Sequence, residues 1–490
     1  MNEDSDRYGA LARVIGLAGA LALILGAKLW LISVYGTDTP LGGHWVEPDQ
    51  VYRPYLTGQL SLSGLLAAHH EHRILLTRLV ALALFAAERR WDPLEQTLVN
   101  AVIHVVAIGM LVVMLTRTFD LARTLLLAAL AALLFALPFG WFNTLIGFET
   151  RFYLLALLAP LSLWLLYASA AWTPRWWLGT LVGVLSYFTM ASGALTFPAF
   201  IVVAAIQFVS GWRRGRGEII GLLVHLALAV AFLLDVVRLQ PAEATPVTSL
   251  QDSFASIAVV ASWPVAKASW PLSARALTAL GLYLPLIVLV LHLLRRPAPL
   301  RDQAWFIAAI ACWASLQMLA LIYGRGQAAL QSRYFDLLLL APLASAAALF
   351  HLQSERWRGT TVFACLWFAA VIIGTGQKAF DDVPPELALW RETTEAQTRD
   401  LKNFLATGDV AALENEPKLA VPYLQPGTLR DAASDPTVRA ILPPDLLGQP
   451  EPPNKPKALA LHQGRLLLPI GLALLVIAVL LATTRRESWL

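Results

Sequence analysis

The chain has 490 residues, of which 57% are hydrophobic and only 14% are charged, and its mean hydropathy is +0.61. Soluble domains carry about 25% charged residues, so this composition excludes a water-soluble globular protein, and a disordered chain needs the opposite balance. The formal net charge is only +4, and the basic residues lie in short segments between apolar runs. That pattern indicates membrane topology and not a nucleic-acid surface.

A membrane-spanning helix needs about 20 mainly apolar residues. Twelve runs come close to this length, and we predict an all-α polytopic membrane protein in which each of them crosses the bilayer. They are residues 11–34, 97–116, 121–138, 152–170, 177–192, 195–211, 218–238, 275–294, 303–323, 334–352, 359–376 and 465–483.

A thirteenth apolar run, residues 74–87, has only 14 residues and carries Arg78 in its middle. An arginine at the centre of a spanning helix costs about 2.5–3.5 kcal/mol on insertion scales. We therefore expect this run to form an interfacial helix that lies along the membrane surface, within a long first outer loop.

The arginines between the predicted spans set the orientation. If Arg485 and Arg486 lie in the cytoplasm, twelve crossings bring every second turn to the same side, and each of these turns is basic. Their arginines are Arg356 and Arg358, then Arg295, Arg296 and Arg301, then Arg213, Arg214 and Arg216, then Arg175, and finally Arg117 and Arg123. The N-terminus falls on this side too, so both termini are predicted to be cytoplasmic.

This topology divides the chain into three parts. Residues 1–376 would form the transmembrane domain, with the first outer loop at 35–95. Residues 377–464 would form an extracytoplasmic segment, with a helix near 385–406 and a proline-rich remainder. This segment is small and loop-rich, so we expect a lid on the membrane domain more than an independent core. Residues 465–490 would form the last span and a cytoplasmic tail.

The first outer loop carries the densest set of polar groups, beginning with Asp38, His44 and Trp45. Glu47 and Asp49 follow, two residues apart across Pro48. An extended backbone would point both carboxylates to one side, where they could act as base and orienting group or share a divalent cation. The alternative is that they are ordinary acids of a solvated loop.

His69-His70-Glu71-His72-Arg73 stands directly before the predicted interfacial helix. Glu71 could cap that helix, whose dipole favours a carboxylate at its start. Alternatively, Glu71, His72 and Arg73 could meet a phosphate-bearing lipid at the membrane surface. The histidine spacing is not that of helical metal ligands, and both cysteines lie inside apolar runs. We predict no metal site of the histidine or cysteine type.

Two later outer turns carry further candidates. One contains Asn143, Glu149 and Arg151, and the other contains Arg325 and then Arg333-Tyr334. The planar guanidinium fork suits phosphate oxygens, although arginines at an interface can also snorkel to lipid headgroups. Arginine is disfavoured in short outer loops, which favours the first interpretation, a clamp for a lipid phosphate.

Polar residues inside the predicted spans are few. Asp235 and Arg238 are three apart and can pair, whereas His104 and Gln317 have no evident partner in the sequence. The lack of a series of acids counts against a pump or symporter.

Taken together, these features resemble the GT-C-type membrane glycosyltransferases. More narrowly, four motifs resemble a group of bacterial GT-C-like proteins, and the resemblance covers most of the chain. The motifs are Glu71-His72-Arg73-Ile74, Asn143…Gly147-Phe148-Glu149…Phe152, Gly324-Arg325…Ser332-Arg333-Tyr334 and Leu442-Pro443-Pro444. The resemblance implies the bacterial cytoplasmic membrane, a polyprenyl-phosphate-linked sugar donor, and transfer on the outer face to a glycan, lipid or protein acceptor.

The resemblance also implies an essential carboxylate in the first outer loop, and here the chain departs from the group. The group's loop is similar to Pro-x-x-Asp-x-Trp followed by Asn-Glu-His-Arg, whereas this chain has Gly43 in place of the Asp and His70 in place of the Asn. Either Asp38, Glu47 or Asp49 takes over the role, or this member has lost catalysis.

Our leading hypothesis is an inverting glycosyltransferase. Glu47 or Asp49, with Asp38 as the third candidate, would accept the proton of the acceptor hydroxyl. The predicted substrate-binding residues are Glu71, His72, Arg73, His44, Trp45, Asn143, Glu149, Arg151, Arg325, Arg333 and Tyr334. A divalent cation is the one cofactor left open, and no nucleic-acid partner is expected. The alternatives are a transporter or flippase for a lipid-linked glycan and a non-catalytic accessory membrane protein.

Overall fold

The computed structural model of the chain describes residues 3–239, 249–267, 269–354, 360–414, 421–423, 425–450 and 454–487. Within these ranges the secondary structure is helical, apart from one isolated bridge between His69 and His72. Arg356 and Arg358, two of the arginines used to predict the orientation, lie outside the described residues.

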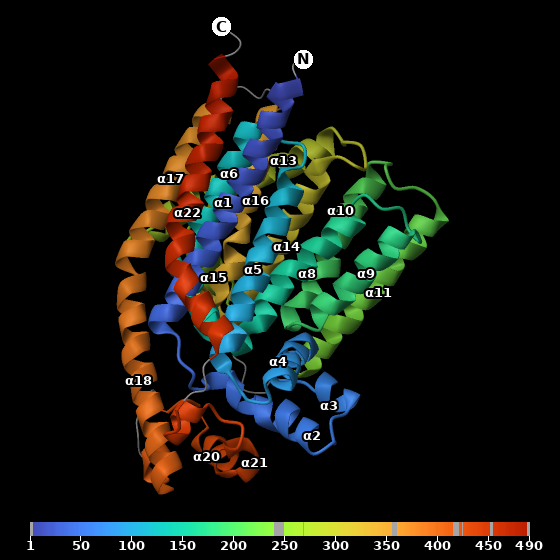
Figure 1. Cartoon of the computed structure of the whole chain (residues 1–490). Helices are drawn as coiled ribbons and strands as arrows, with labels where there is room; N and C mark the ends of the chain where they lie inside the picture. The colour runs from blue at the N-terminus through green and yellow to red at the C-terminus, as the bar shows by residue number, and fades with distance from the viewer. Residues whose placement is uncertain are drawn as a thin grey trace.

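Eleven helical segments of the described chain are long and apolar enough to cross a membrane, so the protein is a multi-pass membrane protein. Their main helices are α1 (Glu3–Tyr35), α5 (Pro93–Thr116), α6 (Leu121–Ala136), α8 (Thr150–Leu166), α10 (Thr196–Val209), α11 (Arg216–Leu239), α13 (Leu272–Arg295), α14 (Gln303–Arg325), α16 (Leu340–Ser354), α17 (Thr360–Asp381) and α22 (Lys455–Glu487). They stand side by side in one bundle (Figure 1).

The run predicted as a span at residues 177–192 is shorter than expected. Its helix, α9 (Pro174–Tyr187), has 14 residues and falls below the length of the eleven candidates, although it packs in the bundle beside α8 and α11 (Figure 1). The chain turns back immediately after α9. Gly193 lies so close to the backbone of Ser186 that a Cβ would stand 2.0 Å from its carbonyl oxygen.

Side-chain caps fix where several bundle helices begin. Asp92, Asp120, Thr173 and Asp302 each accept a hydrogen bond from a backbone N–H in the first turn of α5, α6, α9 and α14 respectively. These residue types are strongly preferred at helix starts because they satisfy the free N–H groups there. Polar residues at the span ends therefore set helix boundaries that hydropathy alone leaves vague.

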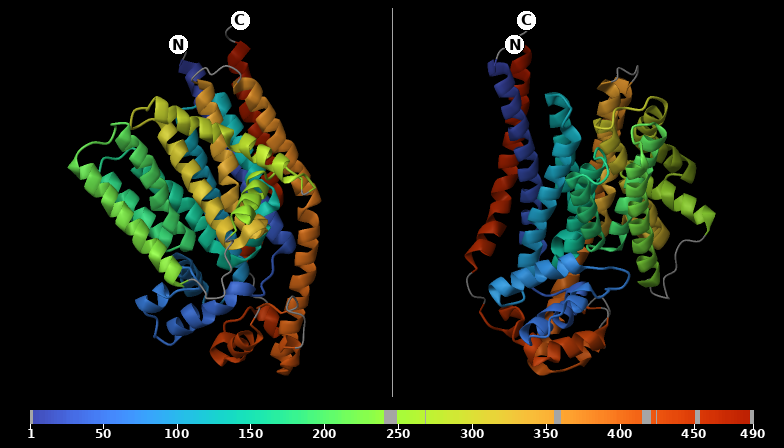
Figure 2. Two further views of the ribbon diagram at one scale, coloured as in Figure 1. Left: turned by 180° about the vertical axis from the view of Figure 1, so that it is seen from behind. Right: turned by 90° about the vertical axis from the view of Figure 1, so that its right-hand side faces the viewer.

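The first and last helices are neighbours along most of their length, which brings the two termini together at one end of the bundle (Figures 1 and 2). The close approach requires small residues. A Cβ at Gly19 would stand 2.9 Å from the carbonyl oxygen of Gly471, and one at Gly471 would stand 2.7 Å from the backbone N of Leu23. Such small-residue contacts are typical of helix pairs in membranes.

The opposite end of the bundle is covered by the first loop and the C-terminal segment. Helix α4 (Leu75–Glu88) corresponds to the predicted interfacial helix and runs crosswise to the bundle helices (Figure 2, right). Arg78 in this helix is 2% exposed, and its guanidinium donates to the Gln50 side chain at 2.6 Å and to the carbonyls of Leu65 and Ala67 at 2.7 and 2.5 Å. The arginine that argued against a span is therefore satisfied by the loop itself.

The C-terminal segment begins with α18 (Val383–Thr407), which extends α17 well beyond the bundle (Figure 1). The short helices α19 (Ala411–Glu414), α20 (Pro426–Ser434) and α21 (Pro436–Arg439) follow. They share one hydrophobic core with the first loop and α4, in which Trp45, Tyr52 and Trp91 meet Phe404 and Ile441. The segment and the loop thus form a single layer over this end of the bundle.

Candidate functional site at the loop-bearing end of the bundle

The three carboxylates predicted as catalytic all have partners in the structure. Asp38 pairs with Lys457 at 2.6 Å, and the same ammonium lies 3.0 Å from Asp92. Asp49 is half exposed and pairs with Arg53 at 2.9 Å; Arg53 also reaches Asp435 of the C-terminal segment at 2.9 Å. These pairs connect the first loop to α22 and to the C-terminal segment.

Glu47 is the most deeply buried of the three, with 2% of its surface exposed. Tyr52 donates its hydroxyl to Oε2 at 2.8 Å, and Gln96 donates to Oε1 at 3.5 Å. Burial raises the pKa of Glu47 to about 7, although the hydrogen bonds from Tyr52 and Gln96 act in the opposite direction. A pKa near neutrality suits a general base, but the oxygens face protein donors.

His44 and Trp45 are buried in the same loop and also serve its packing. The Phe148 N–H donates to His44 Nε2 at 3.0 Å, and Trp45 Nε1 donates to the Pro40 carbonyl at 2.7 Å. Burial lowers the pKa of His44 to about 4, so the ring is neutral. Gly43 packs against the Phe148 ring so closely that a Cβ would stand 2.3 Å from Cδ1. A side chain at this position, where the resembling group carries an Asp, would require the Phe148 ring to move.

Glu71 lies at the tip of a tight turn. His69 and His72 exchange two backbone hydrogen bonds, of 2.8 and 3.0 Å, and His70 between them has a φ of 51°. A non-glycine residue with positive φ is strained, and such strain gathers at functional sites. Glu71 is partly exposed, and its Oε1 lies 3.7 Å from His72 Nε2.

The surroundings of His72 bring distant parts of the chain together. Its Nδ1 accepts the Ala191 N–H at 3.3 Å. The pKa of His72 lies well below its usual value, first because of burial and then because of nearby positive charge on Arg151 and Arg325. The His69 and Phe148 rings lie 5.2 Å apart, and Gln317 of α14 donates to the carbonyl of Ser192, next to Ala191, at 2.9 Å. The turn before α4 therefore packs against the start of α8 and, through residues 191–192, connects to α14.

Two of the predicted phosphate-binding arginines are already paired. Arg73 binds both carboxylate oxygens of Asp235, at 2.9 and 3.0 Å. The sequence suggested Arg238 as the partner of Asp235, because residues three apart on a helix are neighbours, but the loop arginine takes its place. Arg151 pairs with Glu149 at 2.8 Å, and its guanidinium lies over the Phe148 ring.

The other two predicted phosphate-binding arginines, Arg325 and Arg333, are available to a ligand. In the described part of the chain, the side chains of Arg325 and Arg333 have no hydrogen-bond or ion-pair partner. The Arg333 guanidinium lies 4.3 Å from the centre of the Phe142 ring. Tyr334 is buried against Phe152, and Asn143 donates to the Arg333 carbonyl at 2.7 Å. These contacts hold the turn and leave the two charges uncompensated.

Sequence reasoning missed a buried polar cluster beneath this end of the bundle. Lys28 of α1 is 5% exposed and donates to Thr144 at 2.9 Å, and Asp336 is 2% exposed and accepts from Asn143 at 2.8 Å. His104, which the sequence left without a partner, lies 3.7 Å from Asp336. Lys28 and Asp336 line one small cavity of about 10 Å³. A lysine and an aspartate more than 300 positions apart give no local signal in the sequence.

Among the described residues, no group of three or more histidine, cysteine or acidic side chains is arranged to hold a metal ion. The divalent cation left open by the sequence therefore gains no ligand set from the described chain.

The chain is an all-helical, multi-pass membrane protein, and comparisons add a likeness in helix arrangement. No family model and no curated protein matches it. It is similar to an oligosaccharyltransferase of Archaeoglobus fulgidus in complex with zinc and sulfate, with a TM-score of 0.45 and 14% identity over 82% of this chain and 57% of that one.

A second similar structure is the oligosaccharyltransferase AglB of Archaeoglobus fulgidus in complex with an inhibitory peptide and a dolichol-phosphate. Its TM-score is 0.42 and its identity is 13%, over 82% of this chain and 59% of that one. The chain thus covers less than two thirds of either structure. Likenesses of this extent do not indicate an activity, so a proposal about function depends on the residues of the site.

Proposed function

We propose that the protein is a membrane glycosyltransferase that uses a lipid-phosphate-linked sugar donor and acts at the loop-bearing end of the bundle. The observation that carries this proposal is that the turn with Glu71 and His72 packs through His69 against Phe148, over whose ring Arg151 lies, while Arg325 at the end of α14 has no hydrogen-bond or ion-pair partner in the described ranges. Apart from His69, these residues lie within the motifs that resemble bacterial GT-C-like proteins. A carboxylate that can accept a proton and an arginine that is free to bind an anion are what transfer from a phosphate leaving group requires.

Arg325 and Arg333 are the proposed phosphate ligands. Neither has a carboxylate partner in the described ranges, so an anion can bind without breaking an existing ion pair. Guanidinium groups bind phosphate oxygens with short, charge-assisted hydrogen bonds. They would also offset the negative charge that grows on the phosphate as it leaves. Arg73 and Arg151 are assigned to positioning, because Asp235 and Glu149 already neutralise them.

Glu71 is the proposed proton acceptor. The acceptor hydroxyl oxygen would attack the anomeric carbon and pass its proton to Glu71. The bond between that carbon and the phosphate oxygen would break, with its electron pair remaining on the phosphate. The first candidates from the sequence already have partners within the protein: Glu47 accepts from Tyr52, Asp49 pairs with Arg53, and Asp38 pairs with Lys457. Glu71 is partly exposed, and the one ion-pair contact that it makes within the described ranges is to His72, at 3.7 Å.

The test measures transfer of radiolabelled sugar from polyprenyl-phosphate donors in proteoliposomes. Glu71→Gln is expected to lower transfer by about 10²–10⁴-fold, the range for loss of a positioned base, and Arg325→Gln should also lower it. Glu414→Gln and Arg430→Gln are matched controls, because these residues form an exposed pair in the C-terminal segment. Transfer that is unchanged in Glu71→Gln and Arg325→Gln would overturn the proposal.

Gly43 supports a second candidate, a non-catalytic accessory membrane protein. The Phe148 ring fills the space that a side chain at position 43 would need, so the Asp of the resembling group has no equivalent there. The wild-type protein would then transfer no sugar from any donor, and it would co-purify with an active glycosyltransferase. Turnover by the purified chain alone would exclude this candidate.

A further inference from the structure

A second cavity lies at the opposite end of the bundle, where the two termini are. It has a volume of about 680 Å³, which is within the range of small-molecule sites. Three separate turns form it. The α5–α6 turn contributes Arg117, the stretch between α8 and α9 contributes Tyr167 and Arg175, and the α13–α14 turn contributes Arg301.

The charges around this cavity are one-sided. Its lining includes three arginines and no acid, and none of the three forms an ion pair within the described ranges. Asp302 follows Arg301 in the chain, but its carboxylate caps α14 by accepting the Ala304 N–H at 2.8 Å. The lining itself therefore carries positive charge only, and the Asp302 carboxylate next to it is engaged at the start of α14.

Two of these arginines are held in place by an aromatic ring. The guanidinium groups of Arg117 and Arg175 lie 5.6 and 6.0 Å from the centre of the Trp164 ring. Arg175 also donates to the Trp164 carbonyl at 2.7 Å. Aromatic stacking orients a guanidinium while leaving its in-plane N–H groups free, so both side chains are prepared for an anion.

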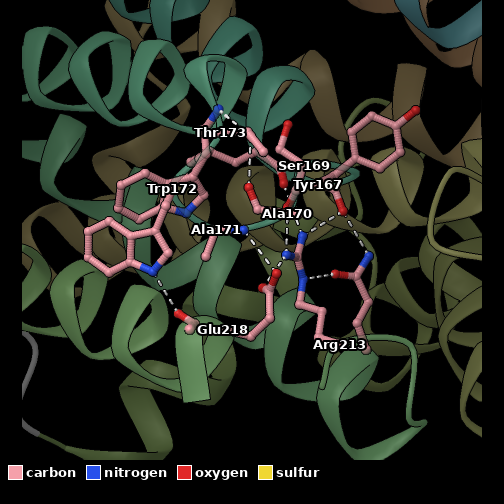
Figure 3. A network of polar contacts seen from close by, with 12 residues as sticks. Tyr167, Ser169, Ala170, Ala171, Trp172, Thr173, Arg213 and Glu218 are labelled. Atoms are coloured by element: carbon pink, nitrogen blue, oxygen red, sulfur yellow. Dashed lines mark hydrogen bonds and ion pairs between the residues drawn. The ribbon is translucent and has the colours of Figure 1, made fainter. Parts of the chain in front are cut away.

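One wall of the cavity, the stretch between α8 and α9, is held in place by Arg213 (Figure 3). Arg213 donates to the carbonyls of Leu166, Tyr167 and Ser169, at 3.0, 3.0 and 2.7 Å (Figure 3). Glu218 binds the same guanidinium and also accepts the Ala171 N–H at 2.9 Å. The stretch that lines the cavity is thereby fixed before any ligand arrives, which lowers the entropy cost of binding.

We propose that Arg117, Arg175 and Arg301 form a binding site for a phosphate group, carried either by a free phosphorylated molecule or by an anionic lipid headgroup. Three guanidinium forks that line one cavity from three turns match the several oxygens of a phosphate ester. The site lies at the other end of the bundle from the proposed transfer site and does not depend on it.

The experiment uses the full chain in detergent, with two probes. Inorganic pyrophosphate is titrated by calorimetry, and phosphatidylglycerol is compared with the phosphate-free diacylglycerol of the same chains by native mass spectrometry. The triple variant Arg117→Gln/Arg175→Gln/Arg301→Gln is tested against the control Arg214→Gln/Arg216→Gln/Arg296→Gln. The control removes three arginines from the same end of the bundle, outside the cavity lining. The single variant Arg301→Gln serves if the triple variant fails to fold.

Loss of the cavity arginines is expected to weaken binding of at least one probe by about tenfold or more, as for loss of charge-assisted hydrogen bonds, while the control binds like wild type. Loss for pyrophosphate identifies a free phosphorylated ligand. Loss for phosphatidylglycerol alone identifies a lipid headgroup. Equal losses in the two triple variants, or no phosphate-dependent binding by the wild type, would overturn the proposal, because a diffuse positive surface would then explain the arginines.

Discussion

Arg213 and Arg333 use the same side chain in opposite ways. Arg213, at the same end of the bundle as the termini, is 5% exposed and donates to three carbonyls, the Gln207 amide oxygen and Glu218 (Figure 3). The guanidinium of Arg333, at the loop-bearing end, lies over the Phe142 ring and has no acceptor among the described residues. An arginine whose hydrogen bonds are all made by protein is structural, whereas one held in place without an acceptor is available to a ligand.

The largest effect is expected from replacing Arg213, the arginine whose hydrogen bonds are made to protein acceptors. Arg213→Met should cost about 3–5 kcal/mol of folding free energy, because it leaves Glu218 without its cation and several buried carbonyls without donors. Thermal unfolding in detergent, followed by tryptophan fluorescence, measures the loss. The neighbouring Arg214 is exposed, so Arg214→Met should change stability by no more than about 0.5 kcal/mol. Equal effects in the two variants would contradict the structural role.

The buried cluster below the candidate site extends the comparison to Lys28 and Asp336, which bind different partners but line one small cavity. Lys28→Met should cost about 1–3 kcal/mol, because it takes a hydrogen-bond donor from the buried Thr144 hydroxyl and the positive charge from the cavity that Asp336 also lines. The double variant Lys28→Met/Asp336→Asn should be more stable than the sum of the single losses predicts. A double-mutant cycle on thermal stability checks this, and simple additivity would show that the two groups act independently.

Glu47 provides a pH-dependent test of a buried carboxyl group whose oxygens accept hydrogen bonds from the protein. Burial raises its pKa from 4.5 to about 7 in the folded state, so the folded protein binds the proton more tightly than the unfolded chain. Stability from this group is therefore full below the unfolded value and is lost as the pH rises through about 7, by up to about 3 kcal/mol.

Unfolding measured at about pH 5 and about pH 8 should show this loss in the wild type and a smaller one in Glu47→Gln. Tyr52→Phe removes a donor that stabilises the charged carboxylate, so its loss should be larger than that of the wild type. An identical pH dependence in wild type and Glu47→Gln would mean that this carboxyl does not contribute. His44, whose pKa is lowered, acts in the opposite direction but is present in each variant.

The sequence was sufficient for the helical membrane architecture, because long apolar runs and the cost of a charge in lipid are local properties. Arg78 is a clear case: its position in a 14-residue run predicted a helix that does not cross, and the structure has α4 lying crosswise. A helix was predicted at residues 177–192, but its end at Tyr187 was not, because the turn after α9 depends on packing of Gly193 against Ser186.

The candidate site was harder to predict, because its members are defined by their partners. Asp38 and Lys457 meet across 419 positions, and Arg73 and Asp235 across 162. No periodicity or spacing reports contacts at such distances along the chain. Sequence could therefore assemble the candidate acids and arginines, but it could not separate those already neutralised from those left open.

The smallest expected effect on stability completes the contrast. Arg333→Gln removes a cation–π contact, which is worth about 0.5–1 kcal/mol at an exposed site, and breaks no ion pair of the described chain. Thermal stability should therefore fall far less than in Arg213→Met. In the same preparation, sugar transfer from the lipid-phosphate donor should fall clearly. Arg333→Lys, which keeps the charge but lacks the planar fork, should recover only part of it. If Arg333→Gln unfolded the protein as readily as Arg213→Met while donor use by the folded fraction stayed the same, Arg333 would be structural too, and the absence of a protein acceptor would no longer distinguish a ligand-binding arginine.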